Sequence, residues 1–129
     1  MKAYIASHER FLAHNTAELI ASNGVEITSR WHSKDFLPTS NHTEDECIAI
    51  AVEDVDDISR ADILVLIAGP DRYSGGKFVE AGIAFGQNKP VIVIGRRENM
   101  LLWHPAVMQF NNIDDAMTYI VQLTLDHTS

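Results

Sequence analysis

The feature that most constrains the fold is a strand-to-helix junction in the middle of the chain. The apolar run Ile63–Ile67 predicts a buried strand, and Gly75 and Gly76 then open a helix that contains Glu80 and the small residues after it. Glycines at such a junction let backbone amides approach a bound anion closely, and the amino end of a helix favours negative charge. The junction therefore predicts a βα unit with an anion-binding crevice.

The remaining chain alternates apolar runs with helix-like segments. Strands are predicted over 2–7, 25–28, 63–67, 91–94 and 106–110, and helices over 11–22, 44–59, about 80–87 and 113–125. Unbroken Val, Ile and Leu strands that alternate with helices are typical of a parallel sheet covered on both faces. The sequence predicts one α/β domain over residues 1–129. It is a doubly wound, mostly parallel five-stranded sheet with helices on both faces, a flavodoxin- or Rossmann-like three-layer sandwich.

The composition limits which binding partners and which cellular compartment are expected. The formal net charge of −8 argues against polymeric nucleic acid as a partner, whereas a small anion needs only one Arg and a few amides. The single cysteine, Cys47, excludes internal disulfides and fits a reducing compartment. No run approaches membrane-spanning length, and no signal-peptide core precedes the first strand. We expect a cytoplasmic protein without a membrane partner.

Two carboxylates are candidates for chemistry. Glu80 is expected in the first turn of its helix, where it is either a nucleophile kept ionised by the helix end or a residue that only stabilises that end. Asp54 shares a helix face with Ile50, Ala51 and Ile58. A carboxylate there must be paired, hydrogen-bonded or at a cleft edge, unless it reaches water at the boundary of the face. The other acidic residues nearby are predicted to be solvated: Glu53, Asp56 and Asp57.

No metal or cofactor is expected, because the six histidines are scattered without metal-ligand spacing and no Walker lysine follows the Gly pair. The polar stretch 31–41 is long enough for a functional lid, although it is equally a surface connection. Lys77 is either a cation that offsets negative charge at the anion-binding crevice or a lysine on the helix surface.

The order of these features resembles that of the nucleoside 2-deoxyribosyltransferase family, which includes the deoxynucleoside 5′-monophosphate N-glycosidases. It is carried by Tyr4, by the segment Asp54-Val55-Asp56-Asp57-Ile58-Ser59-Arg60-Ala61-Asp62, and by Gly75-Gly76 followed by Glu80-Ala81-Gly82-Ile83-Ala84. It covers residues 2 to about 120 and is weakest across 31–43. The resemblance implies that Glu80 is a nucleophile that forms a glycosyl-enzyme ester. It implies that Asp54 positions the sugar and transfers protons, with Tyr4 close to the nucleophile.

The resemblance also implies a set of substrate-binding residues at two loops. They are Ser7, His8, Arg10, Ser74, Gly75 and Gly76. Six residues before the nucleophile, family transferases usually have an Asp, whereas the monophosphate hydrolases have a Ser, as Ser74 is here. Arg10 also matches an Arg of those hydrolases. The chain departs from the family at His8, which replaces a small residue, and at Glu9, which adds negative charge.

Family members often complete the site with a neighbouring subunit. Asn99, Trp103 and His104 are candidates for that contribution, and local packing under their loop is the alternative. The resemblance thus implies a homodimer or higher homo-oligomer that acts on a small nucleoside or nucleotide. The predicted function is cleavage of the N-glycosidic bond, with hydrolysis favoured over base exchange. A non-catalytic nucleotide-binding sensor remains an alternative, because a sheet of this type hosts many functions.

Overall fold

The computed structural model describes residues 1–33, 42–69 and 75–128. The predicted stretch 31–41 therefore lies mostly outside the described residues, and so does Ser74. The strands are β1 (Lys2–Ala6), β2 (Glu26–Ile27), β3 (Ile63–Ile67), β4 (Val91–Ile94) and β5 (Val107–Phe110). The helices are α1 (Arg10–Ala21), α2 (Glu44–Arg60), α3 (Gly76–Gly86) and α4 (Ile113–Thr128), with the 3-10 turns η1 (Trp31–Ser33) and η3 (Met100–Trp103).

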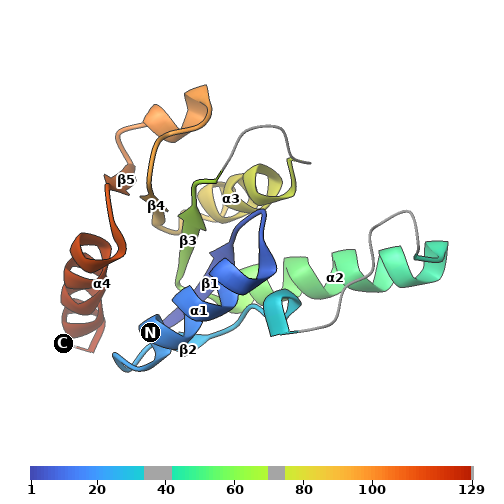
Figure 1. Cartoon of the computed structure of the whole chain (residues 1–129), viewed down its shortest axis with the longest axis horizontal. Helices are drawn as coiled ribbons and strands as arrows, with labels where there is room; N and C mark the ends of the chain where they lie inside the picture. The colour runs from blue at the N-terminus through green and yellow to red at the C-terminus, as the bar shows by residue number, and fades with distance from the viewer. Residues whose placement is uncertain (34–41, 70–74, 129) are drawn as a thin grey trace.

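The five strands form one parallel sheet in the order β2-β1-β3-β4-β5. Helices α1 and α4 bury their apolar residues against one face, and α2, α3 and η3 against the other. The three-layer α/β prediction is therefore confirmed. Because neighbouring residues of a strand face opposite sides, Tyr4 points toward α2 and α3, while Ile5 points toward α1. Figure 1 shows the sheet between these layers, with α2 extending well beyond it.

Two helices differ in detail from the prediction. The buried residues of α1 are Ala13, Ala17 and Ile20, whereas its larger apolar residues Leu12 and Leu19 are each 41% exposed. The small alanines let the backbone of α1 approach the sheet closely. At the end of the chain, α4 continues to Thr128 instead of fraying after residue 125.

Helix α2 begins where the sequence predicts, but its inward face differs. The hydroxyl of Thr43 accepts from the amide of Glu46 at 3.1 Å, and the Glu46 carboxylate accepts from the amide of Thr43 at 3.0 Å, so the two residues form a capping box. Ala51 is exposed. Asp57, predicted to be solvated, is fully buried. That prediction was wrong because Asp57 is paired with Arg30, which lies outside the helix, and with Arg60, the last residue of α2.

The segments that follow β3 and β4 pack so closely that two of their positions have no room for a side chain. Gly95 follows β4 with φ +103, and a Cβ atom at this position would lie 2.7 Å from the Cβ of Ala68. A Cβ on Gly69 would overlap the imidazole ring of His8. The edge of the sheet where β1, β3 and β4 end is therefore tightly fitted, with backbone groups close to the surface. None of the helices in the described ranges is long and apolar enough to cross a bilayer.

Replacing Gly95 by alanine should destabilise the protein more than the same change at Gly24. Both glycines have positive φ, of +103 and +89, but nothing lies within 4 Å of a Cβ at Gly24. Gly24→Ala should cost about 1–2 kcal/mol from backbone strain, and Gly95→Ala should add about 1–3 kcal/mol of overpacking against Ala68. Urea denaturation with unchanged m-values measures both losses. Equal losses would contradict the proposed fit of the edge.

Candidate active site

The described site is built around a contact between β1 and α3. The phenol of Tyr4 donates a short hydrogen bond to Oε2 of Glu80, across 76 positions of sequence. Tyr4 is fully buried and Glu80 is partly exposed. The contact exists because α3 packs over β1, β3 and β4 on the face to which Tyr4 points.

Glu80 is not in the first turn of α3. The helix is capped by Gly75 and starts at Gly76, and its first turn holds no acidic residue. The expected first-turn position is therefore wrong, and stabilisation of the helix end does not explain this carboxylate. The prediction placed the start of the helix too late. Glu80 instead lies about one turn inside the helix, where its side chain turns toward the sheet.

Burial controls the charge state of this site. Desolvation raises the pKa of Glu80 to about 7, the hydrogen bond from Tyr4 opposes the rise, and the negative charge of Asp54 adds to it. The same burial, with the nearby carboxylates, raises the pKa of Tyr4 far above its usual range, so its phenol remains a donor. Near neutral pH the site therefore holds a carboxylate that changes charge easily, which suits nucleophilic or proton-transfer chemistry.

Asp54 enters the site from α2 as part of an acidic cluster. Carboxylate oxygens of Glu53, Asp54 and Asp57 lie within 4.8 Å of one another, a spacing that could hold a metal ion. Cationic donors already engage two of these groups: Arg30 and Arg60 bind Asp57, and Nη1 of Arg30 lies 3.8 Å from Glu53. The cluster is thus balanced by guanidinium groups of the chain itself.

The predicted substrate-binding residues gather at the carboxyl ends of β1 and β3. Ser7 directly follows β1, and its hydroxyl accepts from the amide of Glu9 at 3.2 Å. The ring of His8 lies against Gly69, just after β3. Arg10 opens α1, with its guanidinium 4.8 Å from the ring centre of Phe11.

The remaining predicted members of this group differ in how they are placed. Gly75 and Gly76 form the exposed amino end of α3, and Ser74 is outside the described residues. The carboxylate of Glu9 caps α1 by accepting from two backbone amides. Its negative charge is therefore partly engaged within its own loop.

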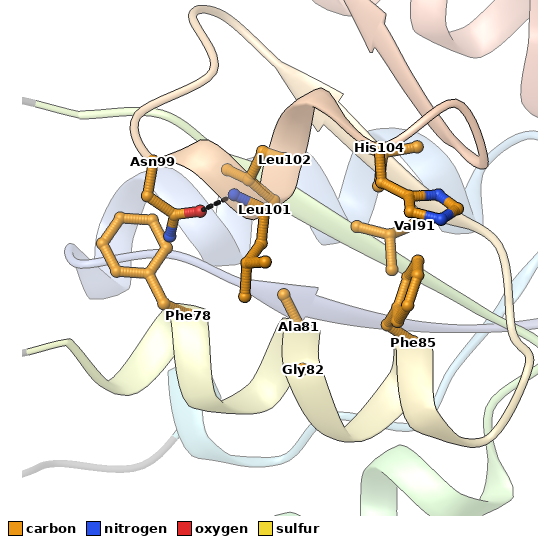
Figure 2. Close-up of a pocket in the computed structure, with 10 residues that line it drawn as sticks. Phe78, Ala81, Gly82, Phe85, Val91, Asn99, Leu101, Leu102 and His104 are labelled. Atoms are coloured by element: carbon orange, nitrogen blue, oxygen red, sulfur yellow. Dashed lines mark hydrogen bonds between the residues drawn. The ribbon is translucent and has the colours of Figure 1, made fainter.

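The three residues predicted to serve a neighbouring subunit lie on the other side of α3. Figure 2 shows Asn99 and His104 around an apolar pocket of about 150 Å³, lined from α3 by Phe78, Gly82 and Phe85. Asn99 caps η3 by accepting from the amide of Leu101 at 3.0 Å.

His104 and Trp103 make contacts within their own region. His104 Nδ1 accepts from the amide of Ala106 at 3.0 Å. The centres of the His104 and Phe85 rings lie 4.8 Å apart in an edge-to-face arrangement. Trp103 is 65% exposed, with the guanidinium of Arg97 4.7 Å from its ring centre. Asn99 and His104 thus line the pocket, whereas Trp103 is not part of its lining and packs on Arg97.

Two ion pairs, each with a buried carboxylate, were not predicted from the sequence. Lys77 Nζ donates to Glu98 at 2.6 Å, and their side chains are 4% and 7% exposed. This pair ties the first turn of α3 to the loop before η3, so the alternative of a surface lysine was wrong. The other pair joins Arg30 to Asp57. The sequence offered one indication that Asp57 is not simply solvated: it lies three residues after Asp54, and this spacing places both residues on one side of the helix.

Comparison with known proteins identifies the family of the chain. The family model described as nucleoside 2-deoxyribosyltransferase matches residues 3–117. The chain therefore belongs to the nucleoside 2-deoxyribosyltransferase family, and it is an enzyme of that type. No curated protein matches it in sequence.

Solved structures share the fold at low sequence identity. A 2-deoxyribosyltransferase from Bacillus psychrosaccharolyticus is 23% identical with a TM-score of 0.73, over 92% of each chain. The 2-desoxiribosyltransferase of Leishmania mexicana is 19% identical with a TM-score of 0.66, over 94% of this chain and 97% of that one. The CMP N-glycosidase of Clostridium botulinum is 18% identical with a TM-score of 0.59, over 93% of this chain and 98% of that one.

Replacing Glu80 by glutamine should stabilise the protein at high pH. The pKa of Glu80 is about 7 in the folded protein and near 4.5 in the unfolded chain, so the folded state binds its proton more tightly. The wild type therefore loses stability as pH rises from about 4.5 to 7, and glutamine does not titrate. We expect the stability gain of Glu80→Gln to be roughly 2–3 kcal/mol larger at pH 8 than at pH 4.5.

Urea denaturation across this pH range measures the difference. His32, whose pKa burial lowers to about 4, makes stability rise with pH over this range in both proteins, so its contribution cancels. Glu46 provides a control of opposite sign, because backbone hydrogen bonding from Thr43 lowers its pKa. The wild type gains stability from this carboxylate only as pH rises toward 4.5, so Glu46→Gln should lose stability relative to the wild type as pH rises below 4.5 and differ from it by a constant amount above that pH. A pH-independent difference for Glu80→Gln would show that Glu80 titrates normally.

Proposed function

We propose that the enzyme cleaves the N-glycosidic bond of a 2′-deoxynucleoside or its 5′-monophosphate through a covalent glycosyl-enzyme on Glu80, with hydrolysis favoured over base exchange. The observation that carries the proposal is the buried hydrogen bond from Tyr4 to Glu80, with the charge of Asp54 acting on both residues. Two carboxylates and a fixed donor are the groups that glycosyl transfer through an oxocarbenium-like state requires.

In the first step, Oε1 of Glu80 attacks the anomeric carbon while Tyr4 holds Oε2. The bond from that carbon to the base nitrogen breaks, and its electron pair leaves with the base, which takes up a proton. In the second step, water attacks the same carbon and loses a proton, and the ester bond breaks to return Glu80 as a carboxylate. Asp54 is the proposed proton carrier in both steps.

A 5′-phosphate is the favoured extra group on the substrate. The amides of Gly75 and Gly76 at the exposed amino end of α3 offer donors and a favourable helix dipole. Arg10 follows β1 at the same edge of the sheet, and we propose that its guanidinium turns from Phe11 to the phosphate. The similar fold of a CMP N-glycosidase supports a nucleotide substrate.

Base exchange is the second candidate activity. It is favoured by the TM-score of 0.73 with a bacterial 2-deoxyribosyltransferase, against 0.59 with the CMP N-glycosidase. The two activities share the glycosyl-enzyme and differ only in whether water or a second base attacks it.

We expect release of free base from at least one deoxynucleoside 5′-monophosphate, measured by chromatography over a panel of deoxynucleosides and their monophosphates. Glu80→Gln should lower the rate by roughly 10³-fold or more, because the nucleophile is removed while its volume is kept. Release that requires an added acceptor base, with a new nucleoside as product, would assign base exchange. Full turnover by Glu80→Gln would contradict the covalent mechanism.

We also propose that a second copy of the chain completes the site through η3. Three apolar side chains of this turn are strongly exposed: Met100 at 83%, Leu101 at 80% and Trp103 at 65%. Exposed apolar groups gathered beside an apolar pocket are typical of an interface. In this proposal Asn99, Trp103 and His104 reach the substrate of the partner.

Leu101→Asp should therefore produce monomers with at least tenfold lower activity at the same protein concentration, as seen by light scattering coupled to size exclusion. Leu125→Asp is the matched control, because Leu125 is 58% exposed on α4, and it should change neither mass nor activity. A fully active Leu101→Asp monomer would exclude a role for the partner.

A further inference from the structure

We infer that Arg30 is a positioning residue for the reaction: by binding Asp57 it fixes Asp54 against Glu80 and balances the negative charge behind the site. This inference rests on the proposed roles of Glu80 and Asp54. Neither the spacing of the sequence nor the resemblance to the family assigned Arg30 a role.

The side-chain contacts of Asp57 are dense. Nε of Arg30 donates to Oδ1 at 3.0 Å and to Oδ2 at 3.1 Å, and Nη2 donates to Oδ1 at 2.6 Å. Nη2 of Arg60 reaches the same Oδ1 at 2.6 Å. A carboxylate with no exposed surface, bound by a guanidinium fork, has little freedom to move.

The backbone around the pair joins α2 to the strands. The amide of Arg30 donates to Oδ2 of Asp57 at 3.1 Å. The hydroxyl of Thr28 donates to the carbonyl of Asp57 at 2.8 Å, and lies 3.3 Å from the carbonyl of Ala3, beside Tyr4. Asp54 is one helical turn earlier on α2. The same contacts therefore fix the position of Asp54 along the axis of α2, relative to Tyr4 and Glu80.

Charge balance gives Arg30 a second effect. It lies within 3.8 Å of Glu53 and 3.7 Å of Asp56, in addition to its bond with Asp57. Arg60 is the other cation on this cluster and pairs with Asp56 at 3.1 Å.

The negative charge of the carboxylates on α2 affects the ionisation of Tyr4 and Glu80. Negative charge on Asp54 and Asp57 raises the pKa of Tyr4, and Asp54 also raises that of Glu80. Removing the Arg30 cation would leave more uncompensated negative charge beside Glu80 and make its ionisation harder.

A purely structural anchor would have a different signature. Buried ion pairs are weak evidence for stability, because desolvation offsets their attraction. An anchor for α2 would change the melting temperature without changing the titration of Glu80. The two roles are therefore separable by measuring stability and titration on the same variants.

Three variants test the inference. Arg30→Gln removes the charge and the fork, whereas Arg30→Lys keeps the charge and loses the fork. Lys89→Gln is the matched control: Lys89 Nζ binds the carbonyls of Ile58 and Ser59 at 2.7 and 2.6 Å, so its loss loosens α2 without touching the carboxylate cluster.

For Arg30→Gln we expect the acid limb of the kcat profile to move up by about 0.5–1 pH unit. At pH 7, kcat should fall about tenfold, with KM changed less than about twofold. Arg30→Lys should lose kcat several-fold without moving the limb, and Lys89→Gln should lower only the melting temperature. If the acid limb of the kcat profile does not move in Arg30→Gln, the proposed charge role is wrong. If Arg30→Lys keeps the kcat of the wild type, the proposed positioning role is wrong.

A carbon-13 NMR titration of the Glu80 carboxyl makes the test independent of turnover. Its midpoint should rise in Arg30→Gln and stay unchanged in Lys89→Gln. If the wild type releases no base, the proposed function fails while this titration still decides the charge role. If the wild type is active and the midpoint is unmoved in folded Arg30→Gln, that role alone is wrong. Should Arg30→Gln not fold, the kcat of Arg30→Lys decides the positioning role.

Discussion

Glu80 is held against β1 by the phenol of Tyr4, in a place where water is largely excluded. Two opposing effects meet there. Loss of water disfavours the ionised carboxylate, and the hydrogen bond from Tyr4 favours it, but burial is the larger effect. The ionised form is therefore less stable than it would be in water, which makes it a better nucleophile once formed. The remaining architecture of the site, from the packing of α3 to the placement of Asp54, serves to maintain this contact.

Each helix that carries a carboxylate of the site also takes part in an ion pair whose carboxylate is buried. Asp57 joins α2 to Arg30, and Lys77 joins α3 to Glu98. These pairs lie within about one helical turn of Asp54 and Glu80, respectively. Directed ion pairs of this kind add to the apolar packing in fixing the position of each helix along its axis. The relative position of Asp54 and Glu80 thus depends on two contacts made outside the reactive cluster.

Strands and helices were predictable because their signals are local. Unbroken apolar runs such as Ile63–Ile67 have few alternatives to a buried strand, and Thr43 with Glu46 marks a helix start. The misassigned residues depend on contacts distant in sequence. Asp57 looks like a solvated acid until Arg30 is brought beside it, and Lys77 looks exposed until Glu98 covers it. The pairing of Tyr4 with Glu80 followed from a family resemblance, since no spacing rule joins residues on different elements.

The fit of His8 against Gly69 has an evolutionary consequence. The imidazole ring occupies the volume that any Cβ at position 69 would need. A side chain at 69 therefore requires either a smaller residue at 8 or a ring that turns away, whereas position 8 can become smaller while Gly69 stays. The coupling between the loop after β1 and the turn after β3 thus runs mainly in one direction, because the residue at 8 limits what position 69 can accept.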